Sequence, residues 1–125
     1  MRQALRADTA VMAVTQGVYD QVPAGSTYPY LVVLHETTLP ERGQCWDAAE
    51  HFVNVHVWSR PKDRGAKECL GLCGLVRTAL DDAELDLGPG VALALLQSET
   101  QRVFSDDDDV TWHGVVTYRA ETHEV

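Results

Sequence analysis

The feature that most constrains the fold is a ten-residue run, His51 to Arg60, in which two kinds of side chain alternate. Valine stands at positions 53, 55 and 57, and β-branched residues at a period of two are typical of a strand with one face on a hydrophobic core. The opposite face is mixed, and it carries Phe52, Asn54, His56 and Trp58. Such a face either becomes buried when subunits meet or lies in solvent with incidental aromatics, and both alternatives stay open.

A helix is predicted shortly after this strand. From about Ala66 to Leu80 the apolar residues recur at helical spacing, at Cys69, Leu70, Cys73, Val76 and Leu80. Gly71 and Gly74 weaken a helix by roughly 1 kcal/mol each relative to alanine, so we expect them to permit close packing against a sheet. Because neither the strand nor the helix can bury its apolar face alone, the other elements must complete a sheet beside this helix.

The rest of the chain supplies a first helical region and further strands. Residues from about Gln3 to Val14 suit a helix broken near Asp8 and Thr9, either of which can cap a second short helix. Extended segments are predicted at Val18–Asp20, Tyr28–Thr37, Val91–Phe104 and Val110–Thr122. The second half of Val91–Phe104 is expected to bulge, and Gly114 marks a bulge or a close backbone approach.

This order of elements lacks the alternation of strands and helices that builds parallel sheets. It therefore predicts a single α+β domain over residues 1–125, with a mainly antiparallel sheet packed against one long helix and a short N-terminal helix. The segment from Thr38 to Ala49 is predicted to be a long loop between two strands. Because long hairpin loops often make contacts, Trp46 in this loop joins Phe52 and Trp58 as a candidate for a protein interface.

Charge and composition exclude several classes of protein. Ten Lys and Arg face 19 Asp and Glu, a formal net charge of −9, so tight binding to nucleic-acid phosphates is not expected. The N-terminal residues lack the apolar core of a signal peptide, and no stretch approaches the roughly 18 apolar residues of a membrane span. We therefore expect a soluble protein made in a cytosol, without membrane contact and with free thiols at Cys45, Cys69 and Cys73.

Two clusters of side chains are candidates for metal sites. The aspartates Asp106, Asp107, Asp108 and Asp109 could attract Ca²⁺, Mg²⁺ or a basic partner, but they lack the glycine spacing of an EF-hand loop and fit a solvated hairpin tip better. Cys69 and Cys73 could supply two ligands to zinc, with His51, His56 or His113 completing four. Both cysteines fall on the apolar stripe of the predicted helix, which favours thiols packed in the core.

No motif of a known catalytic centre is found. A nucleophile elbow, a Cys-His-Asn arrangement, paired carboxylates, a P-loop and a dinucleotide glycine motif are all missing from the sequence. The prediction is therefore a protein that is not an enzyme, with no catalytic residues, no cofactor and no metal. A small metal-dependent or hydrolytic enzyme built around Cys69, Cys73 and the histidines is the competing hypothesis.

Several phrases, in this order and spacing, resemble one protein family. They are Leu5 and Ala7, residues 17–20 (GVYD), 29–33 (PYLVV), 50–51 (EH), 56–60 (HVWSR), 76–80 (VRTAL), 99–106 (ETQRVFSD) and 112–116 (WHGVV). This pattern is similar to the small tail-component family of tailed phages and bacterial gene transfer agents, whose members are tail terminator proteins. The resemblance covers nearly the entire chain.

The resemblance implies a fold and a function. It implies a lambda-type tail terminator fold and a hexameric ring that caps the tail tube, stops its polymerisation and joins it to the head-completion proteins of the neck. The implied place is the tail–neck junction of a virion assembled in the bacterial cytoplasm, where DNA passes through the ring without specific binding. A head-completion or adaptor protein of the neck is the alternative within the virion. In a ring, the four aspartates are expected to face either the lumen or a rim that docks a basic partner.

Overall fold

The computed structural model describes residues 1–42, 47–81, 83, 85 and 89–124. Its helices are α1 (Arg2–Ala7), α2 (Thr9–Val14) and α3 (Lys67–Leu80). Its strands are β1 (Val18–Tyr19), β2 (Tyr30–Arg42), β3 (Asp47–Ser59), β4 (Val91–Ser105) and β5 (Trp112–Glu124). The predicted order of elements is confirmed, and the domain is α+β. No helix in the described ranges is long and apolar enough to cross a membrane.

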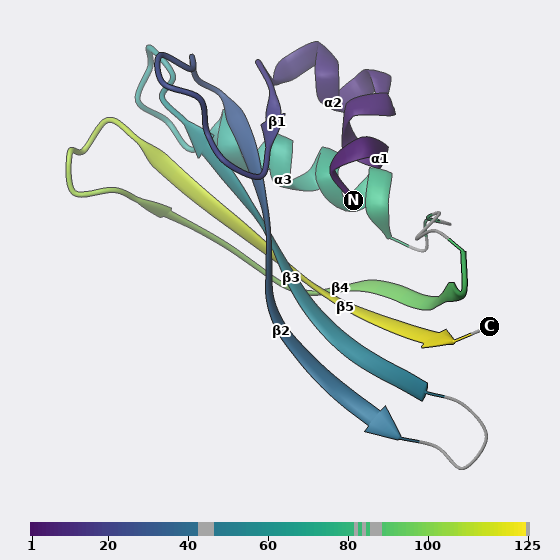
Figure 1. The fold of residues 1–125 in the computed structure, drawn as a ribbon. Coiled ribbons are helices and arrows are strands. Elements are labelled where there is room, and N and C mark those ends of the chain that lie inside the picture. The colour runs from purple at the N-terminus through teal and green to yellow at the C-terminus, as the bar shows by residue number, and fades with distance from the viewer. Residues whose placement is uncertain (43–46, 82, 84, 86–88, 125) are drawn as a thin grey trace.

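The strands form one mixed sheet in the order β1-β2-β3-β5-β4. β1 pairs with β2 in parallel, at Val18 with Leu31 and at Tyr19 with Val32. All other neighbours are antiparallel. The helices lie on one face of this sheet, while the other face has no helix over it in the described part of the chain (Figure 1). We call this second side the open face.

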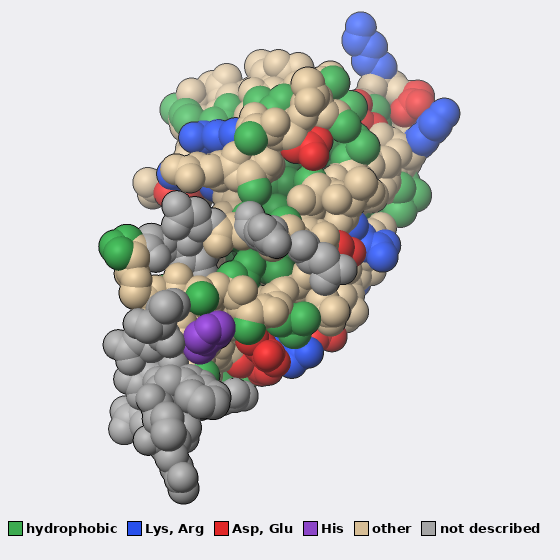
Figure 2. Space-filling model, turned by 90° about the vertical axis from the view of Figure 1, so that its right-hand side faces the viewer, with side chains coloured by type: hydrophobic (Ala, Val, Ile, Leu, Met, Phe, Trp, Pro, Cys, Tyr) green, Lys and Arg blue, Asp and Glu red, His purple; other side chains and the backbone are tan. Residues whose placement is uncertain are grey.

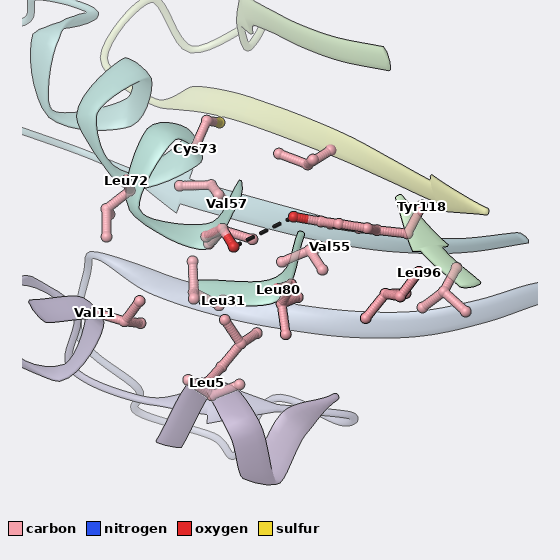
Figure 3. Packing of buried hydrophobic residues seen from close by; sticks show 14 of the residues in the cluster. Leu5, Val11, Leu31, Val55, Val57, Leu72, Cys73, Leu80, Leu96 and Tyr118 are labelled. Atoms are coloured by element: carbon pink, nitrogen blue, oxygen red, sulfur yellow. Dashed lines mark hydrogen bonds between the residues drawn. The ribbon is translucent and has the colours of Figure 1, made fainter. Parts of the chain in front are cut away.

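The core fills the space between the helices and the sheet. Val55 and Val57 of β3 are fully buried there with Leu72 of α3 and Tyr118 of β5 (Figure 3). Burial of Val53, Val55 and Val57 confirms the face assigned from the period-two pattern. Because the side chains of a strand alternate, the residues between these valines point to the open face.

Asp8 separates the first two helices as predicted. Its carboxylate accepts a hydrogen bond from the backbone N–H of Val11 at 3.0 Å, which caps α2. The break lets both short helices place an apolar residue in the same core, where Leu5 of α1 and Val11 of α2 are fully buried.

The long loop predicted from Thr38 to Ala49 is wrong. β2 continues to Arg42 and β3 begins at Asp47, and Thr38 pairs with His51 and Leu39 with Glu50. A register shift between His35 and Thr37 absorbs one extra residue, so the two strands stay hydrogen-bonded beyond it. Pro40 is tolerated because β1 covers only the start of β2, which leaves this stretch at a sheet edge. Cys45 and Trp46 lie outside the described residues.

The glycines have different roles. A Cβ on Gly114 would lie 2.6 Å from Sγ of Cys73 and 3.0 Å from Sγ of Cys69, so this glycine permits the close approach of α3 to β5. The pairing of β5 shows no register shift there, so the position is a close approach and not a bulge. The expectation for Gly71 and Gly74 is wrong, because a Cβ on either would meet nothing within 4 Å. Both lie on the side of α3 that faces away from the sheet.

The last two strands form a hairpin, and β4 bulges twice. The register shifts between Leu93 and Leu95 and again between Ser98 and Thr100. The second shift confirms the bulge expected in the polar half of the strand. Since Ser98 and Thr100 pair with adjacent residues of β5, Glu99 is the extra residue of this bulge.

Candidate functional site

A row of aromatic rings crosses the open face near the β4–β5 turn. The register aligns Tyr30, Trp58, His113 and Phe104 across four strands. The rings of Trp58 and His113 are stacked, with centroids 3.8 Å apart, and Phe104 meets His113 edge-on at 4.9 Å. We call these four side chains the aromatic row. Phe104 remains 43% exposed, so the row presents apolar surface to any partner that covers this face.

Beside the aromatic row, His56 and His113 form a histidine pair. Nδ1 of His56 lies 2.8 Å from Nε2 of His113, and their rings are stacked with centroids 5.0 Å apart. Burial, followed by the nearby His56, lowers the pKa of His113. The His113 ring therefore contributes to the open face as an uncharged, flat side chain near neutral pH.

Phe52 lies farther along the open face, opposite a cluster of charges. Phe52 pairs in register with Arg119 of β5. It is six residues from Trp58 along β3, a distance of about 20 Å in a strand. The two predicted interface residues of β3 thus lie on the same face of the sheet but are far apart on it. Both are partly buried by their own chain.

Arg119 is surrounded by three carboxylates, which we call the carboxylate cluster. Its Nη1 lies 2.8 Å from Oε1 of Glu121 and 3.2 Å from Oε2 of Glu50, and its Nε lies 2.9 Å from Oε1 of Glu99. Hydrogen bonding to Glu50 is the largest cause that raises the pKa of Arg119. One guanidinium faces three carboxylates, so the cluster has a net charge of −2. Sequence reasoning missed it, because these residues meet only through strand register and the bulge at Glu99.

The four aspartates lie at the tip of the β4–β5 hairpin, where the sequence placed them. Asp108 is not free, since its Oδ1 accepts hydrogen bonds from the backbone N–H groups of Val110 and Thr111 at 2.9 and 2.8 Å. Its Oδ2 accepts from the Thr111 hydroxyl at 2.6 Å and from Arg60 at 3.1 Å. The Thr111 hydroxyl is the largest of several causes that lower the pKa of Asp108 to about 2. Asp108 therefore shapes the turn, whereas Asp106, Asp107 and Asp109 are exposed on it.

The zinc ligands considered in the sequence do not come together. Cys69 and Cys73 are fully buried free thiols on the core side of the sheet. A hydrogen bond to Cys73, together with burial, raises the pKa of Cys69. His56 and His113 are on the open face, so the sheet separates them from both thiols. Among the described residues, no group of three or more His, Cys, Asp or Glu side chains has a geometry that could hold a metal ion.

His51 belongs to a different cluster, on the core side beyond α3. Its Nδ1 lies 3.2 Å from Nε2 of His35, and its Nε2 lies 2.9 Å from Oγ1 of Thr122. Burial, followed by the charge of His35, lowers the pKa of His51. These histidines border a hollow of about 480 Å³ that is lined mainly by apolar side chains, including Leu93 and Leu96. Figure 2 shows this side of the molecule, where hydrophobic side chains reach the surface above a histidine.

Comparison with known proteins identifies the class and then the family. The fold matches a chain from a solved structure described as the virion of a native gene transfer agent particle. The TM-score is 0.87 at 24% identity, over 97% of this chain and 90% of that one, which shows a fold used in a virion component. The sequence model of the family "Tail completion protein gp17" matches residues 1–123, and the chain belongs to this family. No curated protein matches.

The family confirms the resemblance noted in the sequence. A tail completion protein is a structural component of the virion tail, so the surfaces described above are considered as contacts with other virion proteins. Nothing in the comparisons points to catalysis. Among the described residues, the open face and the hairpin tip are two candidate surfaces for such contacts.

Proposed function

We propose that this protein is a tail terminator. It forms a hexameric ring with the lambda-type terminator fold, caps the finished tail tube, ends tube polymerisation and joins the tube to the head-completion proteins of the neck. The observation that carries the proposal is the match to a tail completion family over residues 1–123. The match spans almost all of the 125 residues.

A domain with helices on only one face of its sheet suits assembly into a ring. A closed ring is built from heterologous contacts, so each subunit must present two different surfaces to its two neighbours. The open face with Phe52 and Trp58 supplies one such surface. Trp46, which lies outside the described residues, stays a candidate for the other from the sequence alone. Helices on one side and an open sheet on the other make the two sides of the subunit chemically different (Figure 1).

The charge of the protein fits a ring through which DNA passes without being held. With a net charge of −9 per chain, six copies present an acidic ring to the phosphate backbone. Phosphate contacts from Lys and Arg supply most non-specific DNA affinity, and an acidic lumen lacks them. DNA therefore slides along the wall during packaging and ejection.

Removal of the gene tests the terminator role. In a particle-producing strain without this protein, we expect tails of uncontrolled length, because nothing ends tube growth. Tail lengths are measured by negative-stain electron microscopy, and expression of the protein from a plasmid should restore the normal length. Normal-length tails that fail to attach to filled heads would instead assign the protein to the neck as an adaptor and would overturn the terminator role.

The exposed aspartates at the hairpin tip are proposed to dock onto a basic surface of the neck. Replacing Asp106 and Asp107 by asparagine removes both charges but keeps a side-chain oxygen at each position, so position 106 can still accept the hydrogen bond from the backbone N–H of residue 107. Asp108 remains to hold the turn. We expect head-to-tail joining to weaken roughly 2- to 10-fold at low ionic strength. The difference in joining between the variant and the wild type should vanish near 1 M salt, where the screening length falls to about 3 Å.

Joining is measured by mixing purified tails with filled heads and counting complete particles over a range of salt. The control replaces Asp20, an exposed aspartate that pairs with Arg2 of α1, by asparagine. Equal joining by the tip variant and the wild type at every salt concentration would remove the docking role and favour tips that face the lumen.

A further inference from the structure

The carboxylate cluster on the open face has more negative charge than its own chain neutralises. Glu99 and Glu121 approach Arg119 within 2.9 and 2.8 Å, yet their side chains remain 45% and 41% exposed. Glu50 approaches the same guanidinium from β3 at 3.2 Å. Two uncompensated charges on a partly apolar sheet face would be stabilised by a cation arriving from outside.

The same chain concentrates its cations in one segment. Four of its ten Lys and Arg residues fall between positions 60 and 67, namely Arg60, Lys62, Arg64 and Lys67. Arg60 pairs with Asp108, whereas Lys62, Arg64 and Lys67 are exposed. Within the described residues, none of these last three lies within ion-pair distance of a carboxylate. In a protein with a net charge of −9, this cationic segment is a local exception.

Apolar surface surrounds the cationic segment. Lys67 begins α3, and together with Val14 of α2 and Gly71 of α3 it borders a hollow of about 510 Å³, which Asp63 and Glu68 also line. Leu70, one turn along α3, is 49% exposed. The helix side of the subunit thus presents cations beside an apolar depression, and the open face presents carboxylates beside aromatic and aliphatic side chains.

These two surfaces are complementary, and they belong to different sides of one subunit. We propose that the open face of one copy docks onto the cationic segment and adjoining helix surface of a second copy. This contact is heterologous, because the two copies use different surfaces. This inference rests on the proposed ring and names the surfaces that close it. Repetition of the contact places a Lys or Arg of each copy beside the carboxylate cluster of the next, which offsets the repulsion between chains that each carry −9.

Charge reversal tests the contact on the full chain. One variant reverses the open face (Glu99→Lys with Glu121→Lys), and the other reverses the cationic segment (Lys62→Glu with Lys67→Glu). A glutamate at position 67 lies in the first turn of α3, where the helix dipole favours it, so the second variant should keep its fold. Each variant alone brings like charges together at every contact, and we expect ring formation to weaken at least 10-fold in sedimentation analysis.

An equimolar mixture of the two variants should restore the ring. The reversed face of one variant meets the reversed segment of the other, and the two remaining native surfaces also meet. Every contact is then complementary only if the two variants alternate. With one variant labelled with ¹⁵N, native mass spectrometry should find three copies of each in a hexamer. The matched control, Asp106→Lys with Asp107→Lys, changes the net charge as much as the open-face variant does and should form rings like the wild type.

The outcomes separate the contact from the ring itself. Rings that persist in both single variants, or a mixture that stays dissociated while circular dichroism shows folded protein, would overturn this contact and leave the terminator role intact. A wild-type chain that remains monomeric at the highest attainable concentration would overturn the ring, and with it this contact.

Discussion

Replacing Tyr118 by alanine should lower the free energy of unfolding by about 3–5 kcal/mol, as expected for loss of a buried aromatic side chain. Tyr118 is among the largest of the fully buried side chains in the core cluster, and its ring lies between β5 and α3 (Figure 3). Its hydroxyl donates a hydrogen bond to the backbone oxygen of Val76 at 3.3 Å, which ties the helix to the sheet. Since small domains have roughly 5–15 kcal/mol of total stability, this loss removes a large share of it.

Urea denaturation followed by circular dichroism measures this effect. Tyr118→Phe keeps the ring and loses only the hydroxyl, so it should cost about 0.5–1.5 kcal/mol. Phe104→Ala removes an aromatic ring that is half-exposed on the open face, and it should cost about 1 kcal/mol or less. A loss below about 1 kcal/mol for Tyr118→Ala would contradict the packing of α3 on β5 described above.

Gly114→Ala should destabilise the protein by about 1–3 kcal/mol, although it adds only one methyl group. The added carbon would lie 2.6 Å from Sγ of Cys73 and 3.0 Å from Sγ of Cys69, closer than atoms in a packed core tolerate. Either α3 moves away from β5 or the thiols leave their positions. Both responses open the core that holds the helix on the sheet.

A double-mutant cycle with Cys73→Ala isolates this clash. Removal of Sγ of Cys73 eliminates the closest contact of the methyl group added at position 114 and leaves the one with Cys69. The cost of Gly114→Ala should therefore fall by about 0.5–3 kcal/mol in that background. Gly71→Ala is the matched control, because its added carbon would meet nothing within 4 Å, and it should stabilise the helix by up to about 1 kcal/mol. Additive effects at positions 73 and 114 would show that the contact between them is not the cause.

The local features of the structure were predictable from the sequence alone. Alternating valines at positions 53, 55 and 57 assigned both a strand and its core face, because a strand places every second side chain on the same side. The helical spacing that ends at Leu80 gave α3, and Asp8 gave the break between α1 and α2, since a cap acts over three residues. The family resemblance, carried by short phrases in order, was confirmed over residues 1–123.

The tertiary structure decided what depends on pairing between distant strands. The segment from Thr38 to Ala49 has proline and weak local strand preference, yet all of its described residues are strand because each strand is the other's hydrogen-bonding partner. The carboxylate cluster joins Glu50 to Arg119, 69 positions apart, through a register that no local pattern encodes. The direction in which Gly71 and Gly74 face depends on how α3 rotates to bury its thiols against Gly114. Propensity and periodicity are properties of neighbouring residues, whereas register, bulges and helix rotation minimise the free energy of the whole packed domain, so only the folded chain determines them.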